Sequence, residues 1–295
     1  MGERRCVYLL LVAAGVFLMC GIGSPVYAQE KTAEEYIAVF AGGGEAGPVM
    51  EAQLAAIHGL VALGEKAVTP LLETLKHENK YVRANAATAL GRIGATAAVD
   101  PLIASLEDKE AAVRAAAAEA LGHIGEERAI QPLIAQLGKE EEMDKRGATV
   151  ALGALKAKGA VQALLGLLSS ESWEVRWRAA VALGEIGDQQ ALTPLGGRTS
   201  DTDPVVAACA VWAVGAIGGK PDFSGLTSNM NGKEAQVVWG SAWALGVIGS
   251  EEAVKVLAGG LAGENETART ASKTVLQWLD TPGALEALNK AAGNK

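Results

Sequence analysis

The 295-residue sequence is poor in cysteine. Cys6 and Cys20 lie in an apolar segment at the N-terminus, so Cys209 is the only cysteine in the rest of the chain. Once the N-terminal segment is removed, an internal disulfide is excluded and stability must come from packing. Because Cys209 lies in an alanine-rich helical stretch, we expect it to be a small buried apolar side chain.

Aromatic residues and basic charge are also scarce. Aromatics make up 4% of the residues although the hydrophobic class makes up 49%, so the apolar content is mostly Ala, Leu, Val and Ile. This composition suits thin, closely packed helices rather than one large aromatic core. The 26 Lys and Arg residues are outnumbered by 34 Asp and Glu residues, giving a net charge of −8. Since nucleic-acid phosphates require clustered basic residues, we expect no nucleic-acid partner.

The sequence does contain a repeat. The segment VRANAATALGRIG at 82–94 returns as VRAAAAEALGHIG at 113–125, and weaker copies begin further along the chain. Its leucine position recurs every 31 residues, at Leu90, Leu121, Leu152, Leu183, Val214, Leu245 and Leu276. A fixed period of this size indicates a solenoid, in which each unit buries its apolar face only by stacking on its neighbours.

Each repeat is predicted to be a pair of helices. The first helix carries apolar residues at i, i+3 and i+7 from Val68 onwards. In the second helix, Gly91 and its equivalents follow the repeated leucine in six copies. Glycine inside a helix costs about 1 kcal/mol relative to alanine, so we expect a neighbouring helix backbone to pass close by. Five glycines are predicted to end the second helices in the left-handed conformation: Gly94, Gly125, Gly187, Gly218 and Gly249.

The copies are uneven. Lys156 replaces one closing glycine, and Asp144 replaces the valine of one second helix. The first helices around Leu195–Gly197 and Ser224–Leu226 contain glycine and few apolar residues. We expect these two helices to be short, frayed or partly 3₁₀.

The two ends of the array are predicted to be atypical. Thr32 and Glu35 have the spacing of a capping box that opens a helix through about Ala41. The glycine run at 42–44 breaks it, and 48–63 forms an imperfect first repeat. A polar closing helix is expected at 283–291. The domain organisation is then a signal peptide at 1–28, N-terminal capping helices and an imperfect first repeat at 29–66, the repeat array at 67–281, and a C-terminal capping helix and tail at 282–295.

Residues 1–28 are predicted to be a secretory signal. Arg4 and Arg5 supply the positive start, 6–22 the apolar run, and 26–28 an A-x-A-like cleavage site. We therefore expect an exported protein, periplasmic or extracellular, that begins at Gln29. The alternative is an uncleaved anchor, because the 17-residue apolar run is at the lower limit for a spanning helix. Membrane contact is expected only in that case.

The repeats, with PLIASL in the first helix and VRxxAAxALGxIG in the second, resemble HEAT repeats of the phycobilin-lyase-like class. The resemblance is strong over 67–280 and weak over 32–64. It implies an all-α fold, a right-handed α–α superhelix (a HEAT-like solenoid) of about eight helix-pair repeats of 31 residues. It also implies a protein-binding scaffold, because enzymes are a minority on this frame.

Two kinds of enzyme on this frame can be compared with the sequence. Deoxyhypusine-hydroxylase-like proteins hold iron with repeated His-Glu pairs near the start of the second helix, where this chain has pairs such as Ala84-Asn85. The single His77-Glu78 pair lies in an inter-helix loop, and the chain has three histidines in all. We therefore expect no metal and no cofactor. A phycobilin-lyase-like enzyme or accessory subunit is the alternative function, although export would separate it from a pigment pathway. A structural envelope component is a third possibility.

The arginines of the Val-Arg step could be read as a basic ladder. In HEAT-like arrays, however, the resemblance implies that this position bonds carbonyls or loop carboxylates between units. We therefore predict a structural role for four residues: Arg83, Arg114, Arg176 and Arg269.

The candidate partner-binding residues are tryptophans. The face of the second helix opposite the leucine stripe varies between copies and becomes aromatic in the later ones, with Trp177, Trp212, Trp239 and Trp243. The HEAT resemblance implies that this face lines the concave surface. Because tryptophan is enriched at binding hot spots, we predict that these rings are largely exposed and bind a protein or peptide, with no catalytic residues. The alternative is that the rings fill gaps left by the weak first helices.

Overall fold

The computed structural model describes residues 31–41, 47–220 and 222–293. The predicted signal segment, its cleavage site and the glycine run at 42–44 lie outside the described residues. Those residues contain helices and turns and no strand. Their contacts form two compact units, one ending at Leu167 and the other beginning at Leu168.

The unit that ends at Leu167 contains two N-terminal helices followed by helix pairs joined through short 3₁₀ turns. Its α-helices are α2 (Ala33–Phe40), α3 (Gly47–Leu63), α4 (Val68–Thr74), α5 (Lys80–Ile93), α6 (Val99–Ser105), α7 (Ala111–Ile124), α8 (Ile130–Gln136), α9 (Glu142–Ala154) and α10 (Val161–Leu167). The capping box that opens α2 is present, since the Glu35 N–H donates to Thr32 Oγ1 and the Thr32 N–H donates to the Glu35 carboxylate.

The unit that begins at Leu168 continues the pattern. Its α-helices are α11 (Trp173–Ile186), α12 (Leu192–Gly196), α13 (Pro204–Ala216), α14 (Ser224–Met230), α15 (Ala235–Ile248), α16 (Glu251–Ala262), α17 (Glu266–Leu279) and α18 (Pro282–Ala291). The prediction of a short helix is confirmed for α12, which has five residues. It is wrong for α14, which has seven residues like α4. Asp222 stabilises the start of α14 because its carboxylate accepts from the Ser224 N–H and hydroxyl.

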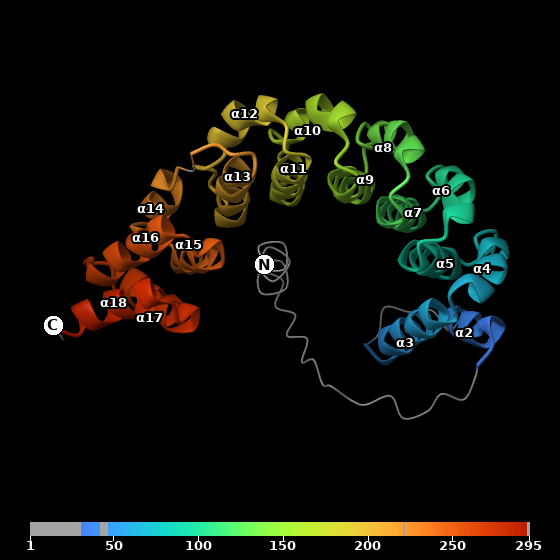
Figure 1. The fold of residues 1–295 in the computed structure, drawn as a ribbon, viewed down its shortest axis with the longest axis horizontal. Helices are drawn as coiled ribbons and strands as arrows, with labels where there is room; N and C mark the ends of the chain where they lie inside the picture. Colours follow the sequence, from blue (N-terminus) through green and yellow to red (C-terminus); the bar gives the residue numbers. More distant parts are fainter. Residues whose placement is uncertain (1–30, 42–46, 221, 294–295) are drawn as a thin grey trace. The chain divides into compact units, whose positions relative to one another are not determined.

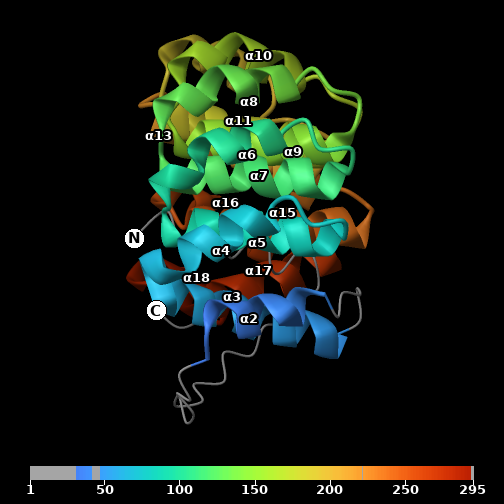
Figure 2. The ribbon, with the colours of Figure 1, turned by 90° about the vertical axis from the view of Figure 1, so that its right-hand side faces the viewer.

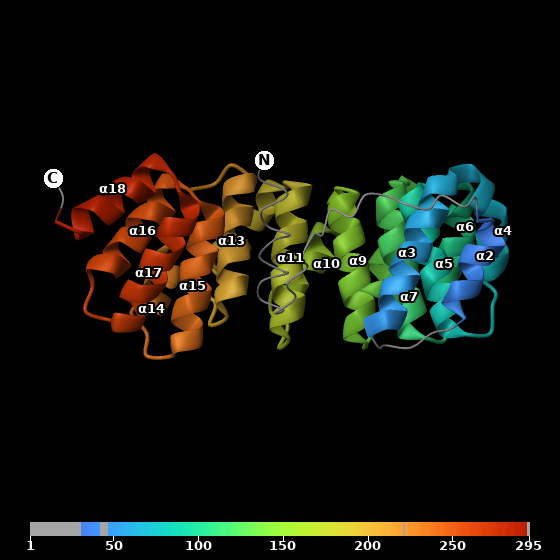
Figure 3. The same ribbon diagram turned by 90° about the horizontal axis from the view of Figure 1, so that it is seen from below.

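Within each unit the helices form two layers. The second helices of the repeats, such as α5, α7 and α9, lie side by side in one layer, and the short first helices lie over them (Figures 1 and 2). In the later unit α11, α13, α15 and α17 form the corresponding layer (Figure 3). This is the all-α solenoid that the 31-residue period predicted.

The repeated leucines form the core between the layers. In seven of the first helices the repeated leucine has an exposed fraction of 0%: Leu71, Leu102, Leu133, Leu164, Leu195, Leu226 and Leu257. The same holds for the second-helix leucines Leu90, Leu121, Leu152, Leu183, Leu245 and Leu276. Cys209 on α13 is buried, as predicted.

The glycines of the Leu-Gly step allow close packing of adjacent second helices. A Cβ added to Gly91 would lie 2.5 Å from the Cα of Ala120, and one added to Gly122 would lie 2.7 Å from the Cα of Ala151. The predicted close approach of helix backbones is therefore confirmed. The predicted closing glycines have positive φ, and Lys156 adopts the same left-handed conformation, with φ of 51°, where the sequence lacks a glycine.

One described stretch, Met50–Thr74, is long and apolar enough to cross a membrane by length and composition. It consists of α3, a 3₁₀ turn that carries Glu65 and Lys66, and α4. Leu60 and Leu71 within it are fully buried in the repeat. A third of its apolar window is buried, whereas Met50 and Leu54 at its start are 53% and 40% exposed.

Three of the four predicted arginines, Arg83, Arg114 and Arg176, join their own repeat to the next one. Arg83 donates two hydrogen bonds to the Asp108 carboxylate, of 2.7 and 2.9 Å, and its Nη1 donates to the carbonyls of His77 and Glu78. Arg176 makes the equivalent bonds to the Asp201 carboxylate, of 3.0 and 2.9 Å. Arg269 in the last repeat donates to two loop carbonyls. The predicted structural role of this position is confirmed.

One repeat makes this bond differently. The position 31 residues after Asp108 is Lys139, so this loop position cannot supply a carboxylate to Arg114. Arg114 instead donates two 2.8 Å bonds to Asp144, which is 1% exposed and stands where other repeats have valine. Hydrogen bonding to Asp144 raises the pKa of Arg114. Lys139 Nζ donates hydrogen bonds to the Leu106 carbonyl, at 3.0 Å, and to the Glu107 carboxylate.

These ion pairs predict an acid dependence of stability. Burial acts to raise the pKa of Asp108 and of Asp201, but the hydrogen bonds from their arginines and from nearby backbone N–H groups outweigh it, so each pKa lies below its usual value. A depressed carboxyl pKa contributes stability that is present above the unfolded-state value of about 3.9 and is lost as the pH falls through the folded-state value.

We therefore expect the free energy of unfolding to decrease as the pH is lowered from about 5 to 2. Asp201→Asn should be less stable than the wild type at pH 7, and the difference should shrink as the pH falls. Urea unfolding followed by circular dichroism at several pH values measures both. If the difference in unfolding free energy between the wild type and Asp201→Asn stayed constant down to pH 2, the lowered pKa of Asp201 would be contradicted.

Candidate functional site

The structure separates the four predicted tryptophans. Trp177 on α11 is 5% exposed, so the prediction that it lies on an open surface is wrong. The Arg178 guanidinium lies over its ring, 4.3 Å from the centroid. Trp212, Trp239 and Trp243 are half-buried rather than largely exposed.

Trp212 and Trp243 pack in different directions. The Trp212 ring lies over Gly184 in the preceding repeat, where an added Cβ would be 2.6 Å from Trp212 Cζ3. Trp243 contacts Trp278 in the following repeat edge to face, with ring centroids 5.5 Å apart and an interplanar angle of 69°. Trp239 and Trp243 pack against the hydrophobic cluster formed by α13 to α18. Trp212 and Trp243 are therefore 31 residues apart in the sequence but pack against different neighbouring repeats.

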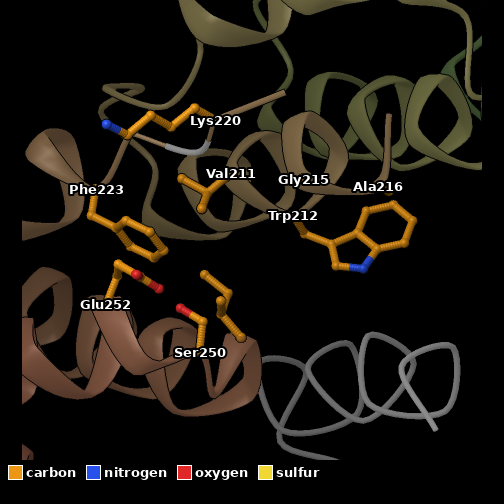
Figure 4. Close-up of a pocket in the computed structure, with 9 residues that line it drawn as sticks. Val211, Trp212, Gly215, Ala216, Lys220, Phe223, Ser250 and Glu252 are labelled. Atoms are coloured by element: carbon orange, nitrogen blue, oxygen red, sulfur yellow. The ribbon is translucent and has the colours of Figure 1, made fainter. Parts of the chain in front are cut away.

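Trp212 instead lines a pocket of about 460 Å³. We call it the α13–α16 pocket (Figure 4). Its residues come from the C-terminal half of α13, the connection between α13 and α14, the end of α15 and the start of α16. It is lined by Val211, Trp212, Gly215, Ala216, Lys220, Phe223, Ile248, Ser250 and Glu252. The walls are mainly apolar, and the polar side chains come from the connection between α13 and α14 and from the start of α16.

The pocket exists because α13 is incompletely covered. The glycine that follows the repeated leucine is buried in other second helices, as at Gly91, Gly122, Gly184 and Gly246. Gly215 occupies the same position on α13, but it is exposed and lines the pocket. Ala216 beside it is exposed as well. The close helix-to-helix contact of the other repeats is therefore replaced here by an accessible apolar concavity.

The connection from α13 to α14 contributes to this opening. Where the earlier repeats have a 3₁₀ turn, the described residues of this connection, 217–220 and 222–223, lie outside any helix. Phe223 then stands where α4 has the buried Val68, yet its ring is only half-buried and faces the pocket. Phe223 packs against the hydrophobic cluster formed by α13 to α18 and also lines the pocket, so its ring lies at the boundary between the two.

Two opposite charges border the apolar walls. Lys220 is exposed on the connection between α13 and α14, and Glu252 is exposed in the first turn of α16. Ser250 caps α16, since its hydroxyl oxygen accepts from the Ala253 N–H at 3.2 Å. The pocket thus combines an apolar floor with a basic and an acidic side chain held on defined turns.

The described residues contain no group of three or more His, Cys, Asp and Glu side chains placed to hold a metal ion. Within the His77-Glu78 pair, His77 Nδ1 accepts from the Asn79 N–H, and both backbone carbonyls bond Arg83. This pair therefore serves the turn before α5.

Sequence reasoning found Trp212 but missed most of its pocket, including Lys220, Phe223 and Glu252. Two signals were available. Phe223 breaks the aliphatic pattern of its position, and Gly219 adds a second glycine directly after the closing Gly218, where the other repeats carry a side chain. Neither shows by itself that α13 is left uncovered.

The paired helices at a fixed 31-residue spacing place the protein in the class of α solenoids. The sequence model for HEAT repeats matches residues 68–152, 132–215 and 161–240, which together cover more than half of the chain. The chain belongs to the HEAT-repeat family.

Several solved structures are similar to this chain. The Escherichia coli protein YibA is 17% identical, with a TM-score of 0.55 over 86% of this chain and 98% of that one. The complex of CpcE and CpcF of phycocyanin lyase from Nostoc sp. PCC7120 is 20% identical, with a TM-score of 0.45 over 94% and 98%. Human deoxyhypusine hydroxylase is 18% identical, with a TM-score of 0.34 over 84% and 96%. No curated protein matches the sequence.

Proposed function

We propose that this protein is an exported HEAT-repeat scaffold, without catalytic activity of its own, that binds a protein or peptide on its layer of second helices. The observation that carries the proposal is the α13–α16 pocket, where Trp212 and Phe223 line an accessible apolar concavity. Fold alone does not define function, so the proposal depends on this site.

The chemistry of the pocket favours a peptide side chain as the bound group. Apolar walls with a few polar groups at the edge are typical of binding pockets, and aromatic anchors carry much of the energy of protein interfaces. Of the four predicted tryptophans, Trp212 is the one that lines this pocket. The binding surface is therefore narrower than the predicted tryptophan face and is centred on α13.

A displayed random-peptide library tests binding without knowledge of the natural partner. Wild-type protein should enrich peptides that share a large apolar residue, and Trp212→Ala should bind those peptides at least tenfold more weakly, as expected for an interface hot spot. Trp173→Ala is a matched control, because Trp173 is exposed and does not line the pocket. No enrichment by folded wild-type protein, or equal binding by Trp212→Ala, would reject the proposal.

Export is tested separately. The basic start, apolar run and cleavage site of residues 1–28 support a mature chain that begins at Gln29. N-terminal sequencing of protein purified from its own cells should give a sequence beginning QEKTAEEY. An intact Met1 on cytoplasmic material would overturn this part of the proposal.

A further inference from the structure

We propose that the α13–α16 pocket recognises a linear peptide in which a large apolar residue is flanked by an acidic residue on one side and a basic residue on the other. This inference rests on the proposed function and specifies the partner of the same site. The apolar residue would enter between Trp212 and Phe223, the acidic flank would face Lys220, and the basic flank would face Glu252.

The apolar part follows from the shape and lining of the pocket. A volume of about 460 Å³ is sufficient for a large side chain together with part of the peptide backbone. Val211 and Ile248 lie with the two aromatic residues around this space, and exposed Gly215 allows a peptide backbone to approach α13 closely. A side chain placed here would cover the part of α13 that the next repeat leaves open.

The charged part follows from the two side chains at the edge. Lys220 and Glu252 come from different turns, one between α13 and α14 and the other at the start of α16 (Figure 4). Among the described residues, neither forms an ion pair: Asp222 beside Lys220 is bonded to Ser224, and the α16 pair joins Glu251 to Lys255. Both charges therefore remain available to a ligand, and their opposite signs select opposite charges in it.

This arrangement distinguishes a mixed-charge peptide from other ligands. A polyanion would be attracted by Lys220 but repelled by Glu252, and an uncharged apolar molecule would leave both charges unused. A peptide with an acidic residue on one side of its apolar residue and a basic residue on the other pairs with both Lys220 and Glu252. The recognised element is therefore an acidic–apolar–basic sequence, with its direction fixed by the positions of the two turns.

Library selections on a charge-swapped protein test this specificity. Wild-type protein should enrich peptides with an acidic residue on one flank and a basic residue on the other. The double variant Lys220→Glu/Glu252→Lys should enrich the reversed order. It should bind wild-type-selected peptides roughly tenfold more weakly, because two exposed attractions become repulsions, and charge-reversed peptides should restore the affinity.

The control is a swap that keeps the same net charge outside the pocket. Glu251→Lys/Lys255→Glu exchanges the neighbouring ion pair on α16, whose charged atoms are 3.3 Å apart, and should leave selection unchanged. Circular dichroism and thermal melting of each variant show that it is folded before selection.

The outcomes separate this inference from the proposed function. Enriched peptides that depend on Trp212 but ignore the charge swap would overturn the mixed-charge specificity and leave peptide binding intact. Folded protein that enriches no peptide would overturn both. Self-association of wild-type protein that Trp212→Ala abolishes, measured by analytical ultracentrifugation, would assign the pocket to a second copy and would also overturn the inference.

Discussion

Asp144→Val is expected to lower the free energy of unfolding by about 3–5 kcal/mol, although it introduces the residue that other repeats carry at this position. The Asp144 carboxylate is 1% exposed and accepts both bonds from Arg114, which is itself 9% exposed. Removing the carboxylate leaves a buried guanidinium with one remaining bond, to the Asp108 carbonyl. An uncompensated buried charge costs far more than the net contribution of the pair.

Urea unfolding of wild type and variant measures the loss. Asp100→Asn is the matched control, because the pair between Asp100 and Arg128 has the same 2.8 Å separation but its side chains are 75% and 52% exposed. Exposed ion pairs contribute about 0–1 kcal/mol, so the control should remain close to the wild type.

A second substitution distinguishes loss of the ion pair from a simple packing defect. Lys139→Asp combined with Asp144→Val restores the arrangement in which Arg83 pairs with Asp108, 25 residues later. The double variant should recover at least half of the stability lost by Asp144→Val. A double variant that is no more stable than Asp144→Val would show that Lys139 does not occupy the position of a loop carboxylate.

The repeat could be predicted in detail because its signals are local and recurrent. Leu-Gly steps, closing glycines and Val-Arg steps are each repeated, so the 31-residue period identifies buried and close-contact positions without knowledge of tertiary structure. Gly91 and Arg83 have the contacts that this reasoning assigned to them. The sequence shows Asp144 only as an exception to the valine pattern. Its partner Arg114 lies 30 residues away, and the missing loop carboxylate is at a third position, Lys139.

The site was less predictable for the same reason. Repeat reasoning assigns a residue to a face, but burial at that face depends on what the adjacent helix presents. Trp177 is covered although it lies on the variable face, whereas Gly215 is exposed although its equivalents are buried. The pocket is therefore a departure from the repeat, and the pattern that predicts the fold does not predict it.

The different surroundings of the tryptophans lead to different expected losses. Trp177→Ala should lower the free energy of unfolding by about 3–5 kcal/mol, since truncation of a buried aromatic side chain leaves a large cavity. It also removes the ring beneath the Arg178 guanidinium. Trp212→Ala should cost less, on the order of 1–2 kcal/mol, because its half-buried ring loses a smaller apolar contact area.

Thermal and urea unfolding of the single variants separate a packing role from a binding role before any partner is known. Trp173→Ala provides the exposed reference, because Trp173 lies at the start of the same helix as Trp177 and is 41% exposed. The expected order of stability is Trp173→Ala, then Trp212→Ala, then Trp177→Ala as the least stable. If Trp212→Ala lost as much stability as Trp177→Ala, its ring would be a core element, and its truncation could not serve as a test of the pocket. If Trp177→Ala unfolded like Trp173→Ala, the ring would be accessible in solution, and Trp177 would return to the candidate binding surface.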